Sequence, residues 1–242
     1  IEPITPPGDY QRFTHGLGWG DLNGDGRPDI LEKGGWWEQP KDLSKGEPWT
    51  KHPVDSKGSD FGPGGAQMYA YDVDGDGLND VITTIEAHNH GLSWFKQSKE
   101  GDVRSFKENV IIWKKEEDNR YGLKITQMHA VDLVDMDGDG LKDLVTGKRY
   151  WAHGPKGDAD PAAPAVLYWL KLVRGPSGVE FVPFKIHDDS GIGVQVVAGD
   201  LNGDSYPDIV VGNKKGIFVH LGEAKKVSKE EYEKQLPKPL TK

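Results

Sequence analysis

Along most of the chain, apolar and polar residues alternate over short runs that are bounded by Gly, Pro, Asn and Asp. This is the pattern of short β-strands joined by turns. The clearest example lies in residues 62–112, where four such runs follow one another, at 66–71, 81–85, 92–95 and 106–112. The same order of runs recurs along the chain. The pattern therefore predicts an all-β protein built from repeated units of four antiparallel strands.

An acidic loop of nine residues lies between the first two predicted strands of each unit. The third copy reads Asp135-Met-Asp-Gly-Asp-Gly-Leu-Lys-Asp143, and the copies begin at residues 21, 72, 135 and 200. Every copy has Asp or Asn at positions 1, 3, 5 and 9. Successive copies thus begin 51, 63 and 65 residues apart. Repeats of this length are typical of β-propeller blades. We therefore expect a β-propeller with four blades in this chain, at about 9–55, 62–112, 124–187 and 191–222.

These loops have the chemistry of calcium sites. Alternate side chains of a tightly turning segment converge, and Ca²⁺ prefers carboxylate, amide and carbonyl oxygens, so the backbone carbonyl at position 7 would complete the shell. The sequence predicts about one Ca²⁺ per blade, four in all. The expected ligands are Asp21, Asn23, Asp25, Arg27 and Asp29; Asp72, Asp74, Asp76, Leu78 and Asp80; Asp135, Asp137, Asp139, Leu141 and Asp143; and Asp200, Asn202, Asp204, Tyr206 and Asp208.

The four loops are not identical. Asn23 and Asn202 stand at position 3, so these two loops offer three carboxylates where the others offer four. Ser205 replaces the Gly found at position 6 of the other copies. Since Gly readily adopts the backbone conformation of a tight turn, we expect the fourth site to be the weakest or the most strained. A solvated turn is the alternative for any single loop, but four copies at corresponding points favour metal sites.

We expect the propeller to cover residues 1–224, and the last unit lacks an evident fourth strand. Residues 1–4 could supply that strand and close a ring of four blades. Alternatively, residues 1–4 end a blade that begins upstream, and the ring is larger. In the tail, residues 225–242, Ser228-Lys-Glu-Glu231 is a capping box that predicts a short helix.

Composition narrows the possible partners. The net charge is −9, and four Ca²⁺ ions would nearly neutralise it. An acidic chain without a basic stripe argues against a nucleic-acid partner, and no apolar run is long enough to span a membrane. The chain has no Cys, so its compartment cannot be read from disulfides. Calcium loops of modest charge fill where Ca²⁺ is plentiful, so we expect an exported protein, periplasmic, cell-surface or secreted.

The motif D-x-[DN]-x-D-G-x-x-D, followed by an apolar strand, resembles the FG-GAP/VCBS repeat of integrin-α-type propellers over about residues 9–221. Segments such as Gln11-Arg-Phe-Thr-His-Gly-Leu-Gly18 also resemble uncharacterised bacterial VCBS-repeat proteins. This resemblance implies a calcium-binding propeller, in which further blades, up to seven in all, precede Ile1. Propellers of this type include adhesins, lectins and polysaccharide lyases, so the resemblance does not imply one function.

The face of the propeller opposite the acidic loops is the expected ligand site. If each loop joins the first two strands of a blade, the other ends of those strands surround the mouth of the central channel. We take His15, His129, Lys148, Arg149 and Glu86 as candidates for catalysis, and Gln67 and Gln195 as candidates for ligand binding. The alternative is that such polar residues only satisfy backbone groups.

Aromatic residues near strand ends are further candidates for ligand binding. An exposed indole stacks well on a sugar ring, and the candidates are Trp19, Trp36, Trp37 and Trp151. Trp94 and Trp169 fall in third strands, where packing between blades is expected. His88 and His90 could ligate a transition metal, although two His at this spacing favour a solvated loop.

The leading functional hypothesis is a binding or scaffold module for carbohydrate or an extracellular protein partner. One alternative is a sugar-active enzyme, such as a polysaccharide lyase, which clustering of the mouth residues would favour. Another alternative is a structural part of a larger assembly, associated with further blades or another chain. An apolar surface at the first strand of the first blade would favour that last hypothesis, whereas a rim of exposed Trp would favour a lectin.

Overall fold

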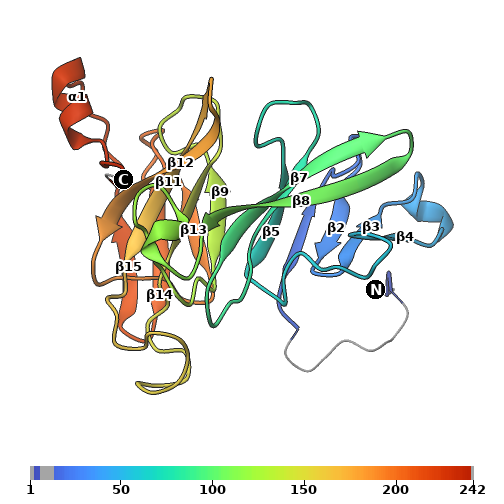
Figure 1. The fold of residues 1–242 in the computed structure, drawn as a ribbon, viewed down its shortest axis with the longest axis horizontal. Helices are drawn as coiled ribbons and strands as arrows, with labels where there is room; N and C mark the ends of the chain where they lie inside the picture. Colours follow the sequence, from blue (N-terminus) through green and yellow to red (C-terminus); the bar gives the residue numbers. More distant parts are fainter. Residues whose placement is uncertain (1–2, 6–13, 241–242) are drawn as a thin grey trace.

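Every acidic loop joins two antiparallel strands, as the sequence predicts (Figure 1). The computed structural model describes residues 3–5 and 14–240. Within these residues the regular secondary structure is almost entirely β-strand, which confirms the predicted fold class. The strands gather into repeated antiparallel units, and each unit begins with the strand that enters its acidic loop.

The first two units form one sheet with the strand order β4-β3-β2-β1-β5-β6-β7-β8. They are joined by a short parallel pairing between β1 and β5, in which Leu17 lies opposite Gln67. Their strands are β1 (Leu17–Gly20), β2 (Asp29–Glu32), β3 (Gly35–Glu38), β4 (Thr50–Pro53), β5 (Gln67–Tyr71), β6 (Asp80–Thr84), β7 (Leu92–Glu100) and β8 (Val103–Ile112).

The third and fourth units form separate sheets. The third has the order β12-β11-β10-β9 and the fourth β13-β14-β15. Their strands are β9 (Val131–Val134), β10 (Asp143–Gly147), β11 (Leu167–Gly175), β12 (Gly178–His187), β13 (Val196–Gly199), β14 (Asp208–Asn213) and β15 (Gly216–His220). The connecting segments include two 3-10 turns (Leu43–Lys45 and Glu116–Asp118), and α1 (Lys229–Gln235) follows the last sheet.

Two predictions concern the ends of the chain. Residues 3–5 form no strand, while Ile1 and Glu2, like residues 9–13 of the expected first blade, lie outside the described residues. A ring closed by residues 1–4 therefore stays a prediction, as does the number of blades. At the other end, the Ser228 hydroxyl accepts a hydrogen bond from the Glu231 backbone N–H at 3.2 Å and caps the helix α1.

The core lies between successive sheets. The second strands β6 and β10 are buried along their whole length, because a sheet covers each of their faces. Val81 packs toward the first unit and its neighbour Ile82 toward the third. Leu144 and Val145 divide in the same way between the second and fourth units. Alternate side chains of one strand thus belong to different cores, as expected for blades packed face to face.

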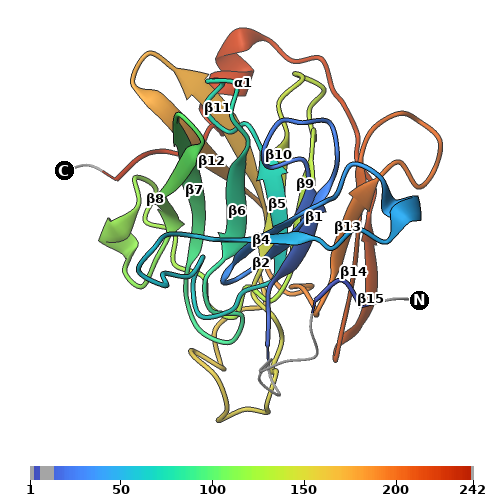
Figure 2. The same ribbon diagram turned by 90° about the vertical axis from the view of Figure 1, so that its right-hand side faces the viewer.

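The first strands of the units lie next to one another at the centre of the molecule (Figure 2). Side chains link them in addition to packing. The Asp132 carboxylate on β9 accepts the backbone N–H of Ala198 at 2.7 Å and the Tyr69 hydroxyl at 3.1 Å. The Gln67 side chain accepts the backbone N–H of Val131 at 3.1 Å. Asp132 therefore links the second, third and fourth units to one another.

Position 6 of each acidic loop requires a left-handed backbone. Its φ is +85° at Gly26, +87° at Gly77, +88° at Gly140 and +73° at Ser205. A Cβ atom added at any of the three glycines would have no other atom within 4 Å. The preference for Gly at position 6 therefore comes from the backbone conformation and not from a lack of space. The strain expected for the fourth loop is therefore present at Ser205.

Ser205→Gly should stabilise the protein by about 1 kcal/mol, because Gly adopts this conformation without the clash between Cβ and backbone. Urea unfolding at one fixed Ca²⁺ concentration measures the change. Gly140→Ser is the matched control and should destabilise by a similar amount. Equal stability of Ser205→Gly and the parent protein would contradict the presence of strain.

Candidate functional site

The first Asp of each acidic loop closes the turn from within. In the third loop, Asp135 accepts the backbone N–H of Gly138 at 2.8 Å through Oδ1 and that of Gly140 at 2.9 Å through Oδ2. The same pair of bonds recurs in the other three loops. The four loops therefore share these two turn-closing hydrogen bonds.

In two loops the carboxylates converge enough to share an ion. Oxygens of Asp72, Asp74 and Asp80 lie within 4.8 Å of one another, and so do those of Asp135, Asp137 and Asp143. The loops also have cationic partners that sequence reasoning missed. The Lys96 ammonium contacts Asp74 and Asp76, and the Lys171 ammonium contacts Asp137 and Asp139. The Arg27 guanidinium pairs with Asp25 in the first loop.

The last Asp of each loop is a buried brace between the loop and the third strand. Asp143 is fully buried, and its Oδ1 accepts the backbone N–H of Leu172 at 2.8 Å. Its Oδ2 accepts the backbone N–H of Met136 at 3.2 Å and the indole N–H of Trp169 at 2.8 Å. The corresponding residues Asp29, Asp80 and Asp208 likewise bind one backbone N–H of the loop and one in or just after the third strand.

Burial makes the charged form of these braces costly. It raises the pKa of Asp29 to about 6, of Asp80 to about 7 and of Asp143 to about 6, although the hydrogen bonds from backbone N–H groups oppose this shift. A cation bound in the loop would favour the charged carboxylate and lower these pKa values again.

Asp143→Ala should destabilise the protein by about 3 kcal/mol or more even in the presence of a chelator, because three buried donors lose their acceptor. Asp137→Ala is the matched control: it removes another acidic side chain of the same loop, an exposed one that pairs with Lys171, and should cost about 1 kcal/mol or less without metal. Urea unfolding in a chelating buffer separates the two. Equal losses would mean that the brace does not hold the loop independently of metal.

Three histidines meet at the end of the strands opposite the acidic loops. His15 precedes β1, His129 precedes β9 and His88 follows β6, so they come from three different units. Their ring centroids are 4.9 Å apart for His15 and His129, 5.1 Å for His88 and His129, and 5.3 Å for His15 and His88. One donor nitrogen from each ring lies within 4.8 Å of the others. We call these three residues the histidine cluster.

The backbone around the histidine cluster is fixed by unusual contacts. Gly64 has φ +133°, and a Cβ there would lie 3.2 Å from the Cβ of His15, so only Gly permits this approach. Gln127 has φ +57°, and its backbone N–H donates to Asn89 O at 2.7 Å. The backbone N–H of Arg149 donates to Gln127 O at 3.1 Å. These bonds bring the loops that carry the three histidines together.

Two buried cations accompany the histidine cluster. Lys148 and Arg149 are 2% and 8% exposed, and burial lowers the pKa of both side chains. The Arg149 Nη2 lies 3.0 Å from the Nδ1 of His88. Burial, together with the charge of Arg149, lowers the pKa of His129 to about 4, so this imidazole is neutral at physiological pH. The surroundings thus combine a neutral imidazole at His129 with fixed positive charge.

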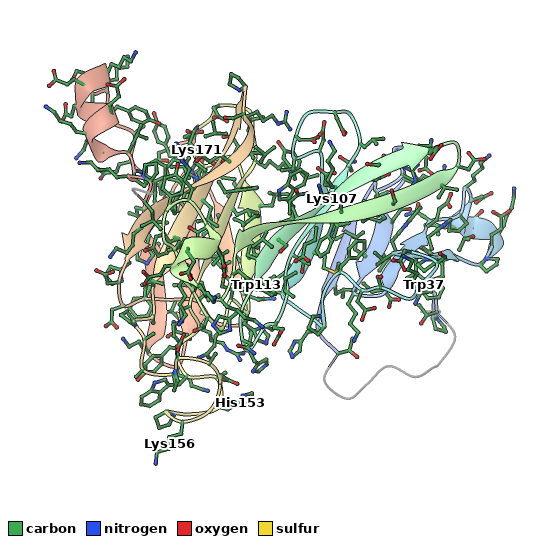
Figure 3. All side chains as sticks on the ribbon, viewed as in Figure 1. Trp37, Lys107, Trp113, His153, Lys156 and Lys171 are labelled. Atoms are coloured by element: carbon green, nitrogen blue, oxygen red, sulfur yellow. The ribbon has the colours of Figure 1, made fainter. Side chains whose placement is uncertain are left out.

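The insertion between β10 and β11 adds an acid and a fourth imidazole. Asp158 Oδ1 lies 3.1 Å from the Nδ1 of His88 and 2.9 Å from the Nδ1 of His153. Burial alone would raise the pKa of Asp158. The hydrogen bonds from the two histidines outweigh burial and hold this pKa below its usual value. Figure 3 places His153 at the edge of the molecule opposite Lys171, so the two kinds of site lie at opposite ends.

The structure brings some predicted mouth residues together and separates others. His15, His129, Lys148 and Arg149 lie in or beside the histidine cluster. Glu86 is half-buried in the loop that carries His88. Of the predicted ligand-binding residues, Gln67 bridges two units through Val131, whereas Gln195 is exposed to solvent.

Two of the four tryptophan predictions are wrong. Trp36 is 3% exposed and Trp37 9%, so neither offers a face to a sugar ring. Both lie on β3, and Trp36 packs into the core between the first two units and stacks on His52. Trp19 is 70% exposed, and Trp151 is half-buried against Tyr150. A rim of exposed Trp, as expected for a lectin, is therefore not present among these four residues.

The structure does not bring His88 and His90 together as ligands of one metal ion. His88 belongs to the histidine cluster, whereas His90 contacts Asn89 through its Nδ1 and is not a member. Sequence reasoning did not identify His153 and Asp158 as part of the site. Their only signal was the Pro- and Gly-rich insertion at 154–164 after a predicted second strand, and its fold back onto His88 is a tertiary contact.

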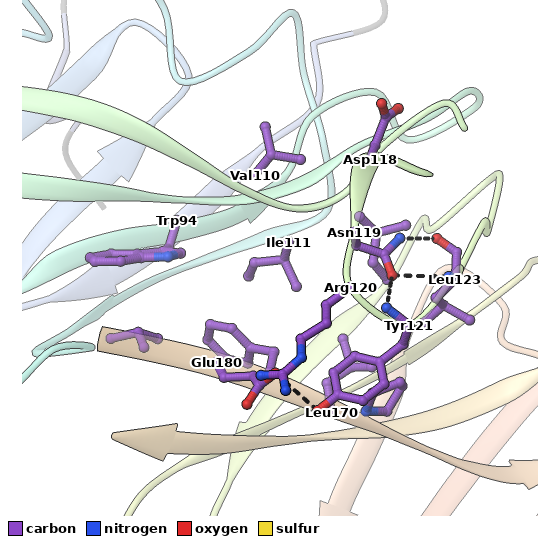
Figure 4. Close-up of a pocket in the computed structure, with 14 residues that line it drawn as sticks. Trp94, Val110, Ile111, Asp118, Asn119, Arg120, Tyr121, Leu123, Leu170 and Glu180 are labelled. Carbon is purple, nitrogen blue, oxygen red and sulfur yellow. Dashed lines mark hydrogen bonds and ion pairs between the residues drawn. The ribbon is translucent and has the colours of Figure 1, made fainter. Parts of the chain in front are cut away.

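A separate depression lies between β8 and β12 (Figure 4). Its wall includes Trp94, Ile111 and Leu170 of the second and third units. At its rim, Glu180 accepts hydrogen bonds from Arg120 at 2.8 Å and from the Tyr121 hydroxyl at 3.0 Å. None of the predicted mouth residues lines it, so this depression is a packing groove between two sheets.

Comparison with known proteins identifies the repeats. The radial set of antiparallel sheets with an acidic loop after each first strand is an all-β fold of the β-propeller type. The FG-GAP-like repeat matches residues 72–146, and the FG-GAP repeat matches residues 192–222. The chain therefore carries FG-GAP repeats in these two segments. A search of curated proteins gave no match, and in the part of the chain that the structure describes no helix has the length and apolar character to cross a membrane.

Proposed function

We propose that this chain is a calcium-braced β-propeller module of an exported protein, and that it acts by binding a ligand or partner. The convergence of carboxylate oxygens in the acidic loops carries this proposal. FG-GAP repeats often bind calcium and are typical of extracellular proteins, which supports both the metal and the location. Ca²⁺ would displace the Lys96 and Lys171 ammonium groups from the second and third loops and bind the ligands predicted from the sequence.

The surroundings of the histidine cluster support an acidic ligand. Arg149 and Lys148 supply positive charge from side chains that are largely buried. A guanidinium binds carboxylates through paired hydrogen bonds. An acidic carbohydrate fits this chemistry, and so does an acidic patch on an extracellular protein. Binding to a panel of acidic polysaccharides tests the proposal, with Arg149→Gln as the variant that should lose binding. Full binding by that variant would place the ligand elsewhere.

A sugar-active enzyme is the second candidate, because the mouth residues cluster within reach of one another. A lyase would produce unsaturated sugars from the same polysaccharides, and their ultraviolet absorbance would appear with the parent protein and not with His129→Gln. Association with further blades or another chain is supported by a different observation: Leu17 and Trp19 on β1 are 68% and 70% exposed.

Chelation with EGTA should lower the melting temperature substantially, because metal that binds only the folded state stabilises it by mass action. Differential scanning calorimetry on a calcium-loaded sample, before and after EGTA, measures the change. Restoration of the melting temperature by Ca²⁺, and not by the same concentration of Mg²⁺, is the control. An unchanged melting curve of a demonstrably loaded sample would contradict structural calcium.

Two matched substitutions rank the sites. Asp139→Ala should destabilise the calcium-loaded protein more than Asp204→Ala, since the third loop has four carboxylates and keeps its Gly, whereas the fourth has three and the strained Ser205. Both substitutions remove the carboxylate at position 5 of their loop. Equal losses at the same Ca²⁺ concentration would contradict this ranking.

A further inference from the structure

The rings of the histidine cluster are oriented so that their nitrogens can point to one centre. The donor lone pair of an imidazole nitrogen lies in the ring plane. The planes of His15 and His88 are inclined by 56°, those of His88 and His129 by 74°, and those of His15 and His129 by 86°. Rings inclined in this way can surround an ion, and the donor atoms already lie within 4.8 Å of one another.

Unpartnered buried polar atoms mark the same place. Among the described residues, four buried side-chain atoms have no hydrogen-bond partner, and three of them are His129 Nδ1, Arg149 Nε and Gln127 Oε1. Buried polar groups without partners are rare and ask for an ion, a water molecule or a ligand. The backbone N–H groups of Arg149 and His129 both donate to Gln127 O, so the three residues are neighbours beside the histidine cluster.

The contacts of His88 are incompatible with one another in the absence of a ligand. A guanidinium only donates, so the contact with Arg149 requires an unprotonated Nδ1. The contact of the same nitrogen with Asp158 requires a proton on it. If Nδ1–H of the neutral imidazole donates to Asp158, the Nε2 is unprotonated and can bind a metal once the Arg149 Nη2, 3.5 Å away, moves aside. A carboxylate that orients a histidine in this way is the usual partner of a metal-bound imidazole.

We propose that His15, His88 and His129 bind one divalent transition-metal ion of the zinc type, with an open coordination position beside Arg149 that takes an anionic oxygen ligand. Imidazole nitrogen suits Zn²⁺ and its transition-metal neighbours, whereas Ca²⁺ requires oxygen ligands. Three protein ligands leave a position for a water molecule or substrate, as in catalytic zinc sites. A carboxylate bound there would also satisfy the guanidinium of Arg149.

A second set of potential ligands, His88, His153 and Asp158, is less suitable. His153 stacks on His88 with their planes inclined by only 13°, so the lone pairs of the two rings run parallel and do not converge. The side chain of His153 is also 64% exposed. We therefore assign Asp158 the role of positioning His88, and His153 a place at the rim.

This inference does not depend on calcium in the acidic loops, because the two sites share no residue and lie at opposite ends of the strands. Both can therefore be tested in one sample. Protein without a polyhistidine tag would be stripped of metal, saturated with Ca²⁺ and titrated with Co²⁺ and Zn²⁺. Co²⁺ reports its nitrogen ligands and coordination number through its visible absorption, and calorimetry gives the stoichiometry and affinity of Zn²⁺.

The proposal predicts one Zn²⁺ per chain at this site and a Co²⁺ spectrum of low coordination number. His129→Gln and His15→Gln should each weaken binding by at least about 100-fold, and Asp158→Asn by about 10- to 100-fold. His153→Gln is the matched control and should bind as the parent protein does. Circular dichroism and cooperative thermal melting show whether each variant folds. If His129→Gln does not fold, His15→Gln provides the test.

Three results would overturn the assignment. They are no stoichiometric binding of Zn²⁺ to calcium-saturated protein, unchanged binding by folded His15→Gln and His129→Gln, and loss of binding in His153→Gln equal to that in His129→Gln. The last result would place the ion on the second set of ligands.

Acetate tests the open position beside Arg149. Added to the Co²⁺-loaded protein, acetate should shift the visible spectrum, and Arg149→Gln should weaken its apparent affinity about tenfold, the loss of one charge-assisted contact. An unchanged spectrum, or the same acetate affinity in the variant, would show that the position is closed or that Arg149 does not face it.

Discussion

The buried Asp at the end of each acidic loop is the interaction on which the rest of the molecule depends. It fixes the loop that precedes it and the third strand of its unit through backbone N–H groups, and it is present in all four repeats. Backbone pairing already holds the second strand between the first and the third, and the Asp adds the link from the loop to the third strand. The exposed acidic positions of the loop are therefore held in place by a residue that solvent does not reach.

Neighbouring units use the same loops as attachment points. Gln97 and Arg104 of the second unit donate to the backbone carbonyls of Leu22 and Asn23 in the first loop. Arg174 of the third unit donates to Val73 O in the second loop at 3.0 Å. An ion that orders a loop would thus also order the contact between two units. This explains how a metal at one end of a hairpin could stabilise the whole arrangement.

The alternation within strands and the loop motif predicted most of the fold. The strands, the joining of first and second strands by each loop, and the helix after Ser228 all depend on local sequence, so a pattern can reveal them. The burial of Trp36 could not be predicted, because it depends on packing against the neighbouring unit. The approach of Lys171 on β11 to Asp137 in the acidic loop is likewise a contact between residues that are distant along the chain.

The candidate site was predicted in part for the same reason. Strand order placed His15 and His129 at one end of the molecule, and the structure brings their rings together. His153 and Asp158 lie in an insertion whose path is set by tertiary contacts, such as the bond from Thr126 Oγ1 to Ala159 O at 3.1 Å. Composition shows that such a segment exists, but only its packing shows which residues it brings to His88.

The central claim is that the four repeated loops are calcium sites built on a common brace. Equilibrium dialysis of metal-free protein against labelled Ca²⁺ tests it most directly, because it counts bound ions without relying on stability. We predict about four ions per chain, with the weakest binding assigned to the fourth loop by its loss in Asp204→Ala. A chain that retains no Ca²⁺ at millimolar concentrations, where such sites fill, would contradict the claim.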